Sequence, residues 1–282
     1  MNIEKIKEYF KKNKRPKEKK KQVSDDVDDN VLLCDDMHFD AKEAYKLLRT
    51  NVMFTLPDKT KGCAIGITSP IRGEGKSTVA INLAYTFATN NSKVLLVDMD
   101  MRLPSIAKKL KMLSKIGLSD YLIGTIDEKF IIHKTGKYSN WDVIFSGSIP
   151  PTPSELIGSN KMKKFIDNAK KSYDYIIIDL PPVNIVSDAL AAKDFIDGFI
   201  ITVREGYSDK HSLADCMRQL AFLEANVLGF AVTDSNDGIG SYGKRYRNYY
   251  RYYRKKKYGY YKKKYGYYSK NYEYAYREND KQ

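Results

Sequence analysis

The residues best suited to chemistry lie in one short glycine-rich turn, Gly73-Glu74-Gly75-Lys76-Ser77-Thr78. The turn follows an apolar, β-prone run at 64–67 and leads into a helical pattern that begins near residue 77. Glycines let backbone N–H groups converge on a phosphate, and a helix start adds the positive end of its dipole. Lysine can reach nucleotide phosphates, and a serine hydroxyl can bind Mg²⁺. This context predicts a P-loop that binds ATP, although Pro70 stands where the usual pattern begins with glycine.

Acidic residues follow two apolar runs farther along the chain. Leu95-Leu96-Val97 leads into Asp98-Met99-Asp100-Met101-Arg102, and Ile176-Ile177-Ile178 leads into Asp179. In open parallel sheets, ligands lie beyond the carboxyl ends of the strands, so carboxylates there can face bound phosphates. They can also bind a hard cation such as Mg²⁺ through oxygen. A single acid after a strand is common in loops, but three such elements in this order predict a site for phosphoryl transfer.

These motifs require strands that end at a common edge, and the sequence provides suitable elements. Short apolar runs alternate with helical stretches, which is typical of a mostly parallel sheet with helices on both faces. We therefore predict an α/β fold of the P-loop NTPase type over residues 38–240. The predicted strands are 64–67, 94–97, 143–145, 175–178, 198–203 and 227–232. The predicted helices are 40–53, 77–90, 106–109, 154–171, 189–195 and 208–225.

The two ends of the 282-residue chain differ from this middle part. Of the net charge of +14, residues 1–24 contribute +7 (ten Lys/Arg, three Glu) and residues 242–282 contribute +11 (fourteen Lys/Arg, three acids). We interpret residues 1–37 as a flexible arm that is first basic and then acidic. Residues 241–282 hold 15 of the 23 tyrosines and almost no aliphatic residues, which predicts a disordered basic tail.

Composition also limits the cellular setting. The chain has no run of 18 apolar residues, so we expect no transmembrane helix. Its basic N-terminal stretch leads into more charge rather than into the apolar segment of a signal peptide. The three cysteines, Cys34, Cys63 and Cys216, are too far apart to suggest a disulfide framework. We expect a cytoplasmic protein whose basic arms associate with the inner face of the cell membrane or with another anionic partner.

Together, the motifs resemble those of the bacterial tyrosine kinases (BY-kinases) of capsule and exopolysaccharide synthesis, which are related to the MinD/ParA P-loop ATPases. The resemblance covers residues 38–240 and the character of the tail. Residues 73–78 resemble the family's first motif, the D-x-D-x-R run ending at Arg102 its second, and the run beginning at Asp179 its third. The segment P-P-T-P-S-E-L at 150–156 is close to another that the family commonly carries.

The resemblance implies a role for each motif residue. Lys76 and the backbone amides of the loop would bind ATP. The ATP-binding residues would be Gly73, Glu74, Gly75, Lys76, Ser77 and Thr78. Mg²⁺ would be organised by Ser77, Asp100 and Asp179. Asp98 would accept the proton of the incoming tyrosine, and Arg102 would support the acidic cluster. Phosphoryl transfer requires mainly positioning and charge neutralisation, so such a set of residues suffices.

Two further features of the family have counterparts here. The helix predicted at 40–53 contains Glu43, Lys46 and Arg49, which resemble an E-x-x-R-x-x-R oligomerisation motif. Lys46 replaces an arginine and cannot form its bidentate fork, and a solvated helix face on a monomer is the alternative interpretation. The tyrosine-rich tail resembles the family's autophosphorylation cluster, for which we select Tyr258, Tyr260, Tyr261, Tyr265, Tyr267 and Tyr268.

The resemblance implies partners as well. One is a transmembrane activator, a polysaccharide co-polymerase, whose cytoplasmic tail completes the active site. Others are further copies of the chain, in a homo-oligomer such as a ring, and a cognate tyrosine phosphatase. The lack of a predicted spanning segment fits the version of the family in which kinase and activator are separate chains.

Two other functions compete with the kinase. A MinD/ParA-type ATPase would hydrolyse ATP and use the basic arms to bind membrane or DNA. However, such ATPases usually carry lysine where this chain has Ile71, and they have no use for fifteen tail tyrosines. A nucleic-acid-binding tail on a degenerate NTPase would use its interleaved basic and aromatic residues to stack on single strands. The kinase accounts for the most features, and we do not expect nucleic acid as a partner.

Overall fold

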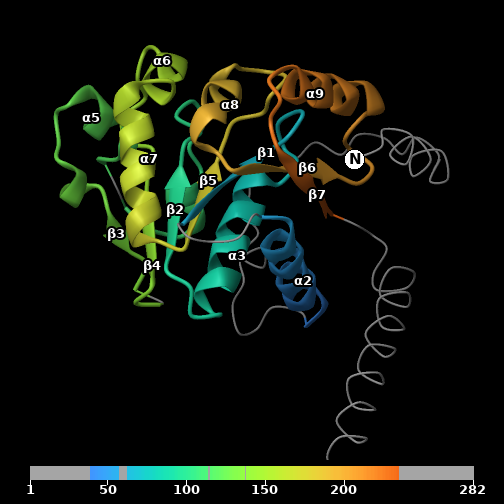
Figure 1. The fold of residues 1–282 in the computed structure, drawn as a ribbon, viewed down its shortest axis with the longest axis horizontal. Coiled ribbons are helices and arrows are strands. Elements are labelled where there is room, and N and C mark those ends of the chain that lie inside the picture. The colour runs from blue at the N-terminus through green and yellow to red at the C-terminus, as the bar shows by residue number, and fades with distance from the viewer. Residues whose placement is uncertain (1–38, 57–61, 114, 137, 235–282) are drawn as a thin grey trace, which may run out of the picture. The chain divides into compact units, whose positions relative to one another are not determined.

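The computed structural model describes residues 39–56, 62–113, 115–136 and 138–234. The arm at 1–37 and the tail at 241–282, both predicted to be flexible, lie outside the described residues. Within the described ranges, one seven-stranded sheet has the order β3-β4-β2-β5-β1-β6-β7 (Figure 1). Its strands are β1 (Cys63–Thr68), β2 (Val94–Asp98), β3 (His133–Lys134), β4 (Trp141–Ile144), β5 (Tyr175–Asp179), β6 (Gly198–Arg204) and β7 (Val227–Thr233). Every pairing is parallel except that of β3 with β4.

The central strands are buried along their whole length and mostly apolar, because helices cover both faces of the sheet. Every residue of β1, β2 and β5 is buried. Along β5, Ile176 and Ile178 pack into one hydrophobic cluster, whereas Tyr175 and Ile177 pack into another on the opposite face. This period of two is the alternation expected of a strand. The predicted α/β fold with a mostly parallel sheet is therefore confirmed.

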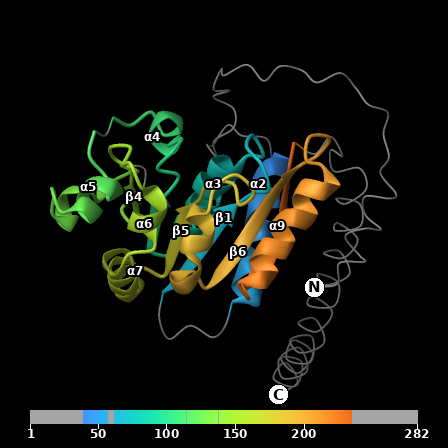
Figure 2. The ribbon, with the colours of Figure 1, turned by 90° about the horizontal axis from the view of Figure 1, so that it is seen from above.

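The helices divide between the two faces of the sheet (Figure 2). One cluster is built against α2 (Phe39–Thr55), α3 (Lys76–Ala88) and α4 (Ile106–Lys109). The other is built against α5 (Leu118–Ile123), α6 (Pro153–Ile157), α7 (Asn160–Ser172), α8 (Asp188–Ala191) and α9 (Lys210–Phe222). Two single-turn 3₁₀ helices, η2 (Glu128–Phe130) and η3 (Lys193–Phe195), complete the described elements. No helix among the described residues is long and apolar enough to span a bilayer.

Some local details differ from the sequence prediction. The helix expected at 154–171 is divided into α6 and α7, because Gly158 ends α6 and Ser159 caps α7 by accepting a hydrogen bond from the Met162 amide at 3.2 Å. The helix expected at 189–195 is likewise divided into α8 and η3. The short elements α5 and β3 were not predicted. None of these differences moves the strands that carry the motifs.

The sheet order brings the three predicted motifs to one edge. β1 lies between β5 and β6, and β2 pairs with the other side of β5. In register, Asp98 at the end of β2 is opposite Asp179 at the end of β5, and Ile67 near the end of β1 is also opposite Asp179. The carboxyl ends of β1, β2 and β5 therefore meet where the glycine-rich turn begins.

Candidate active site

The glycine-rich turn joins β1 to α3 in a conformation that glycine favours. Gly73 and Gly75 have φ values of +79° and +87°, in the left-handed region that costs other residues about 1–2 kcal/mol. Gly75 also immediately precedes α3, and a Cβ placed there would lie 3.2 Å from a methyl carbon of Thr233. Backbone conformation at Gly73 and Gly75, and close packing at Gly75, thus explain the glycines of the turn. The turn leads directly into the start of a 13-residue helix.

Glu74 turns its side chain into the protein. One carboxylate oxygen accepts a hydrogen bond from the Ile71 amide at 3.0 Å, and the other accepts one from the Ser208 hydroxyl. The Glu74 carbonyl accepts a further bond from the Thr233 hydroxyl at 2.9 Å. Burial raises the pKa of Glu74 above its usual range. The Glu74 side chain therefore holds the glycine-rich turn in shape from within the protein.

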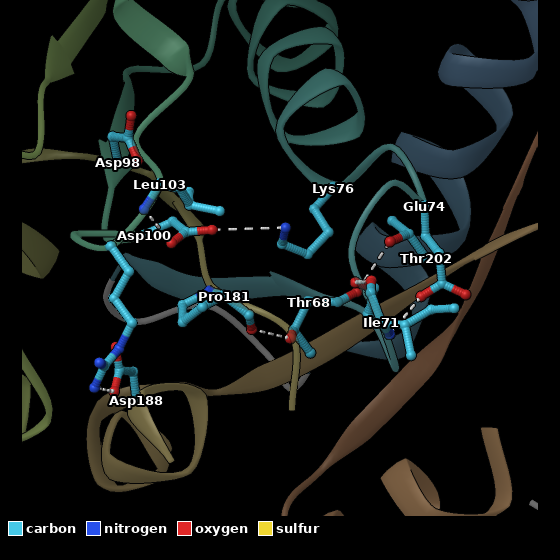
Figure 3. A network of polar contacts seen from close by, with 12 residues as sticks. Thr68, Ile71, Glu74, Lys76, Asp98, Asp100, Leu103, Pro181, Asp188 and Thr202 are labelled. Atoms are coloured by element: carbon cyan, nitrogen blue, oxygen red, sulfur yellow. Dashed lines mark hydrogen bonds and ion pairs between the residues drawn. The ribbon is translucent and has the colours of Figure 1, made fainter. Parts of the chain in front are cut away.

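Lys76 and Asp100 lie across the mouth of the turn from each other. The Lys76 ammonium is 3.7 Å from a carboxylate oxygen of Asp100, and both side chains are about one-tenth exposed (Figure 3). The second oxygen of Asp100 accepts a hydrogen bond from the Leu103 amide at 3.1 Å, which closes a tight turn over 100–103. The distance is long for an ion pair with full contact. A phosphate or cation can therefore enter between the two groups without breaking a short bond.

Asp98 and Asp179 are fully buried neighbours with unsatisfied oxygens. One oxygen of Asp98 accepts a hydrogen bond from the Ile106 amide at 3.1 Å, and its other oxygen has no partner among the described residues. Neither oxygen of Asp179 has one. Burial, reinforced by the charge of Asp179, raises the pKa of Asp98 well above its usual range. Burial raises the pKa of Asp179 to about 6, although Lys76 and the nearby Ser77 hydroxyl oppose the rise.

These unsatisfied oxygens fit a bound cation. A buried acceptor without a donor is costly unless a ligand satisfies it, and carboxylate and hydroxyl oxygens are the ligands that Mg²⁺ prefers. No group of three His, Cys, Asp or Glu side chains in the described part of the chain is arranged as a complete metal site. A cation here would complete its coordination with nucleotide phosphates and water, as Mg²⁺ commonly does.

Arg102 lies against a residue that the sequence prediction did not include. Its Nε and Nη2 atoms donate to the two oxygens of Asp188 at 2.9 and 3.0 Å. The Ser154 hydroxyl donates to the same carboxylate. Arg102 was expected to support the acidic cluster, but its main partner is Asp188 on α8, and Asp100 acts on it only through its charge. Ser154 belongs to the 150–156 segment noted in the sequence, whereas nothing in the sequence singled out Asp188.

The residues of the expected oligomerisation motif have different environments on α2. Lys46 and Glu43 form an exposed pair within the helix, with Nζ and Oε1 2.7 Å apart. Arg49 instead donates to the Thr86 carbonyl of α3 at 2.7 Å. Desolvation lowers the pKa of Arg49, and Glu43 partly opposes this. The three residues therefore do not present one free polar row, because Arg49 is engaged within the protein.

The tail tyrosines selected from the sequence, Tyr258, Tyr260, Tyr261, Tyr265, Tyr267 and Tyr268, lie outside the described residues. The described site contains the glycine-rich turn, Lys76 and the buried carboxylates at the ends of β2 and β5.

The fold and the turn define the class of protein. A strand that leads through a glycine-rich turn into a helix, at the carboxyl edge of a mostly parallel sheet, is the arrangement of a P-loop NTPase. A family model described as "AAA domain" matches residues 64–226. The structure is also similar to that of the septum site-determining protein MinD of Pyrococcus horikoshii complexed with Mg-ADP. The identity is 26%, over 62% of this chain and 72% of that one, with a TM-score of 0.52.

Closer relatives identify the family within this class. The chain is 35% identical to the tyrosine-protein kinase YwqD of Bacillus subtilis over 187 residues, which span 66% of this chain and 78% of that protein. It is also similar in structure to the kinase domain of the Escherichia coli tyrosine kinase ETK. That likeness has a TM-score of 0.68 and 28% identity over 76% of this chain and 82% of that one. The chain belongs to the bacterial tyrosine kinase family and is a protein-tyrosine kinase.

Proposed function

We propose that this kinase uses Mg-ATP to phosphorylate the tyrosine cluster of its own tail, in trans within a homo-oligomer, and thereby regulates capsule or exopolysaccharide synthesis or export. The observation that carries the proposal is the convergence of Lys76, Asp98, Asp100 and Asp179 at one edge of the sheet. The tail supplies 15 tyrosines as acceptors, among them Tyr258, Tyr260, Tyr261, Tyr265, Tyr267 and Tyr268.

ATP binds with its phosphates in the glycine-rich turn. The amides of residues 73–78 and the start of α3 surround the phosphates, and Lys76 contacts the β- and γ-phosphates. The long contact between Lys76 and Asp100 supports this assignment, because the ammonium is held near the mouth without a short bond to replace. The inward position of the Glu74 side chain supports a role in shaping the turn rather than in contacting the nucleotide.

Ser77, Asp100 and Asp179 would hold Mg²⁺ together with the nucleotide, Asp179 through water. When bound, it neutralises charge on the phosphates. Asp98 accepts the proton when the tyrosine oxygen bonds to the γ-phosphorus and the bond from that phosphorus to the β-phosphate oxygen breaks, leaving ADP. The position of Asp98 at the end of β2, opposite Asp179 and with one oxygen that has no partner among the described residues, supports this role.

Self-association brings one copy's tail to another copy's site. The exposed Glu43 and Lys46 on α2 are the candidates for contact with a second copy, and Arg49 shapes this face from within by binding α3. A transmembrane activator with a cytoplasmic tail and a cognate tyrosine phosphatase act on the kinase from outside. The basic arms place the chain at the inner face of the cell membrane, at about 1 kcal/mol per Lys or Arg near an anionic surface.

Phosphorylation of the tail neutralises its positive charge and is the regulatory step. The tail carries fourteen Lys/Arg and three acids. Each phosphate adds about −1.5 to −2 at neutral pH, so six phosphotyrosines add roughly −9 to −12. This change is as large as the tail's present positive charge. The phosphorylated tail therefore leaves an anionic surface or an acidic partner to which the unmodified tail binds.

The test is phosphotyrosine detection on purified full-length chain incubated with Mg-ATP, with and without the cytoplasmic tail of the activator. We expect a signal on the wild type and none on Lys76→Met, since the variant lacks the ammonium that contacts the transferred phosphate. Replacing the six selected tyrosines by phenylalanine should remove most of the signal. Mixing that variant with Lys76→Met should restore phosphorylation on the latter chain if transfer occurs in trans.

Two results would contradict the proposal. Equal phosphotyrosine on wild type and Lys76→Met would mean that another kinase supplies the phosphate. ATP hydrolysis by the wild type without any phosphotyrosine, even with the activator tail present, would favour the MinD/ParA-type ATPase.

A further inference from the structure

Asp188 is a fully buried carboxylate at the first position of α8, and it is fully engaged. Arg102 approaches it with two parallel donors, Nε at 2.9 Å and Nη2 at 3.0 Å. Such a bidentate pair fixes the plane of the guanidinium as well as its distance. Burial of one partner strengthens the pair and makes it costly to break. The arrangement is therefore suited to holding a loop in one position.

Ser154 completes the cluster from a third element. Its hydroxyl donates to the oxygen of Asp188 that Nη2 contacts, and it lies 3.4 Å from Nη2 itself. It also lies 3.2 Å from the Ser187 hydroxyl. Asp188 thus ties the turn that follows β2 to the start of α6 and to the start of α8. These segments are far apart in the sequence, and none of them contains the glycine-rich turn.

The turn that Arg102 anchors is the one that carries Asp100. One oxygen of Asp100 accepts from the Leu103 amide, so that residues 100–103 form a closed turn with Arg102 inside it. The other oxygen of Asp100 faces Lys76. Figure 3 shows Lys76 and Asp188 on different sides of Asp100. Arg102 therefore points its charge away from the phosphate-binding turn, where Asp188 neutralises it.

We propose that Asp188 and Ser154 are positioning residues that act through Arg102, holding the turn 100–103 so that Asp100 faces Lys76 and the incoming Mg²⁺. The inference rests on the proposed Mg-ATP site and adds two residues to it.

The test measures how much Mg²⁺ strengthens nucleotide binding. A fluorescent ADP analogue is titrated into full-length protein in Mg²⁺ and again in EDTA, and the ratio of the two Kd values gives the Mg²⁺ gain. Loss of an outer-shell partner of a metal site typically costs 10- to 100-fold, so we expect Asp188→Asn and Asp188→Ala to reduce the gain roughly 10-fold. Ser154→Ala should reduce it less. Kd in EDTA should change by less than about threefold, because the phosphate-binding turn is untouched.

A double-mutant cycle separates positioning from general stability. If Asp188 acts through Arg102, Arg102→Ala should cause the same loss of Mg²⁺ gain, and Asp188→Ala should add nothing to it. The matched control is Asp215→Ala, which removes the acid from an exposed Arg218–Asp215 pair on α9 and should leave the gain unchanged. Asp188→Asn preserves the size of the side chain and keeps the test valid if Asp188→Ala fails to fold.

An unchanged Mg²⁺ gain in both Asp188 variants would overturn the inference. Losses that multiply in the double variant would also overturn it, as would an equal loss of affinity in EDTA. The proposed function is tested by a separate measurement, the detection of phosphotyrosine on the wild-type protein. A wild type with a normal Mg²⁺ gain but no phosphotyrosine would contradict that function, while the positioning role would still be decided by the ratio of Kd values.

Discussion

Asp179→Asn should stabilise the nucleotide-free protein and abolish its response to Mg²⁺. Asp179 is fully buried, and neither of its oxygens has a hydrogen-bond partner among the described residues. Burial raises its pKa from the usual 3.8 to about 6. A charge held in this way destabilises the fold until a cation arrives. Asparagine has almost the same shape and removes the charge, so the cost should fall in the absence of Mg²⁺.

The size of the effect follows from the pKa. A rise of about two units corresponds to about 3 kcal/mol of destabilisation at neutral pH. The asparagine amide is itself left without partners, which cancels part of the gain, so we expect about 1–2 kcal/mol. For a folded domain of this size, that is a rise in melting temperature of roughly 2–8 °C. Because the folded-state pKa is the higher one, the gain should be complete above about pH 6 and disappear towards pH 4.

Urea denaturation in EDTA at pH 7.5 and pH 5 measures this difference directly. Repeating the measurement with Mg-ADP tests the second half of the prediction. A ligand at 100 times its Kd stabilises the folded protein by about 2.7 kcal/mol. Asp179→Asn should lose most of the share of this stabilisation that depends on Mg²⁺. The matched control is Asp142→Asn. Asp142 is almost as buried, but it accepts from Lys134 at 2.9 Å and from Tyr173 at 2.8 Å, so its loss should destabilise by about 1–3 kcal/mol.

The reasoning is refuted if Asp179→Asn is less stable than the wild type in EDTA at pH 7.5. It is also refuted if Asp179→Asn and Asp142→Asn change the free energy of unfolding in the same direction and by the same amount. Hydrogen bonding would then not distinguish a functional carboxylate from a structural one.

Three shorter predictions concern the turn and α2. Glu74→Gln can keep both side-chain hydrogen bonds and should leave nucleotide affinity within about twofold, whereas Glu74→Ala should lower stability by about 1–3 kcal/mol in urea denaturation. Since burial raises the pKa of Glu74, the stability of Glu74→Gln relative to wild type should increase as pH rises above 4.5. Arg49→Ala should lower the free energy of unfolding by about 1.5–3 kcal/mol, because it removes the hydrogen bond to the Thr86 carbonyl. Lys46→Ala should leave the free energy of unfolding unchanged and weaken only self-association, which sedimentation measures. Gly75→Ala should cost about 1–2 kcal/mol and weaken nucleotide binding in the same fluorescence titration, because its φ is +87°.

The sequence was sufficient to predict the convergence of the main motifs. Apolar strands followed by Asp98 and Asp179 had to end at one edge, because parallel strands with helical crossovers point the same way. Glycines before Lys76 likewise predicted the sharp turn. These features are local, so they are visible in the order of residues. The confirmed fold follows from the same alternation of strands and helices.

Partners that are distant in the sequence could not be predicted in this way. Arg102 and Asp188 are separated by 86 positions, and their pairing depends on how α8 lies against the turn after β2. Nothing about Arg49 in isolation reveals that it reaches a carbonyl on α3. The division of α6 from α7 was different, because Gly158 followed by Ser159 is a local signal for a helix end and a helix start.

Hydrogen bonding separates the buried carboxylates of the site into two kinds. Glu74 and Asp188 are fully buried and have donors on both oxygens, and each holds a loop beside the site. Asp98 and Asp179 are equally buried but keep unsatisfied oxygens, and they lie opposite each other at the carboxyl ends of β2 and β5. Burial alone does not distinguish these four carboxylates, because all of them are fully buried. The unsatisfied pair is unfavourable for folding and is explained by a ligand, whereas the satisfied pair is explained by the fold itself. The arrangement therefore places two carboxylates that hold loops by hydrogen bonds beside two carboxylates that lack donors among the described residues.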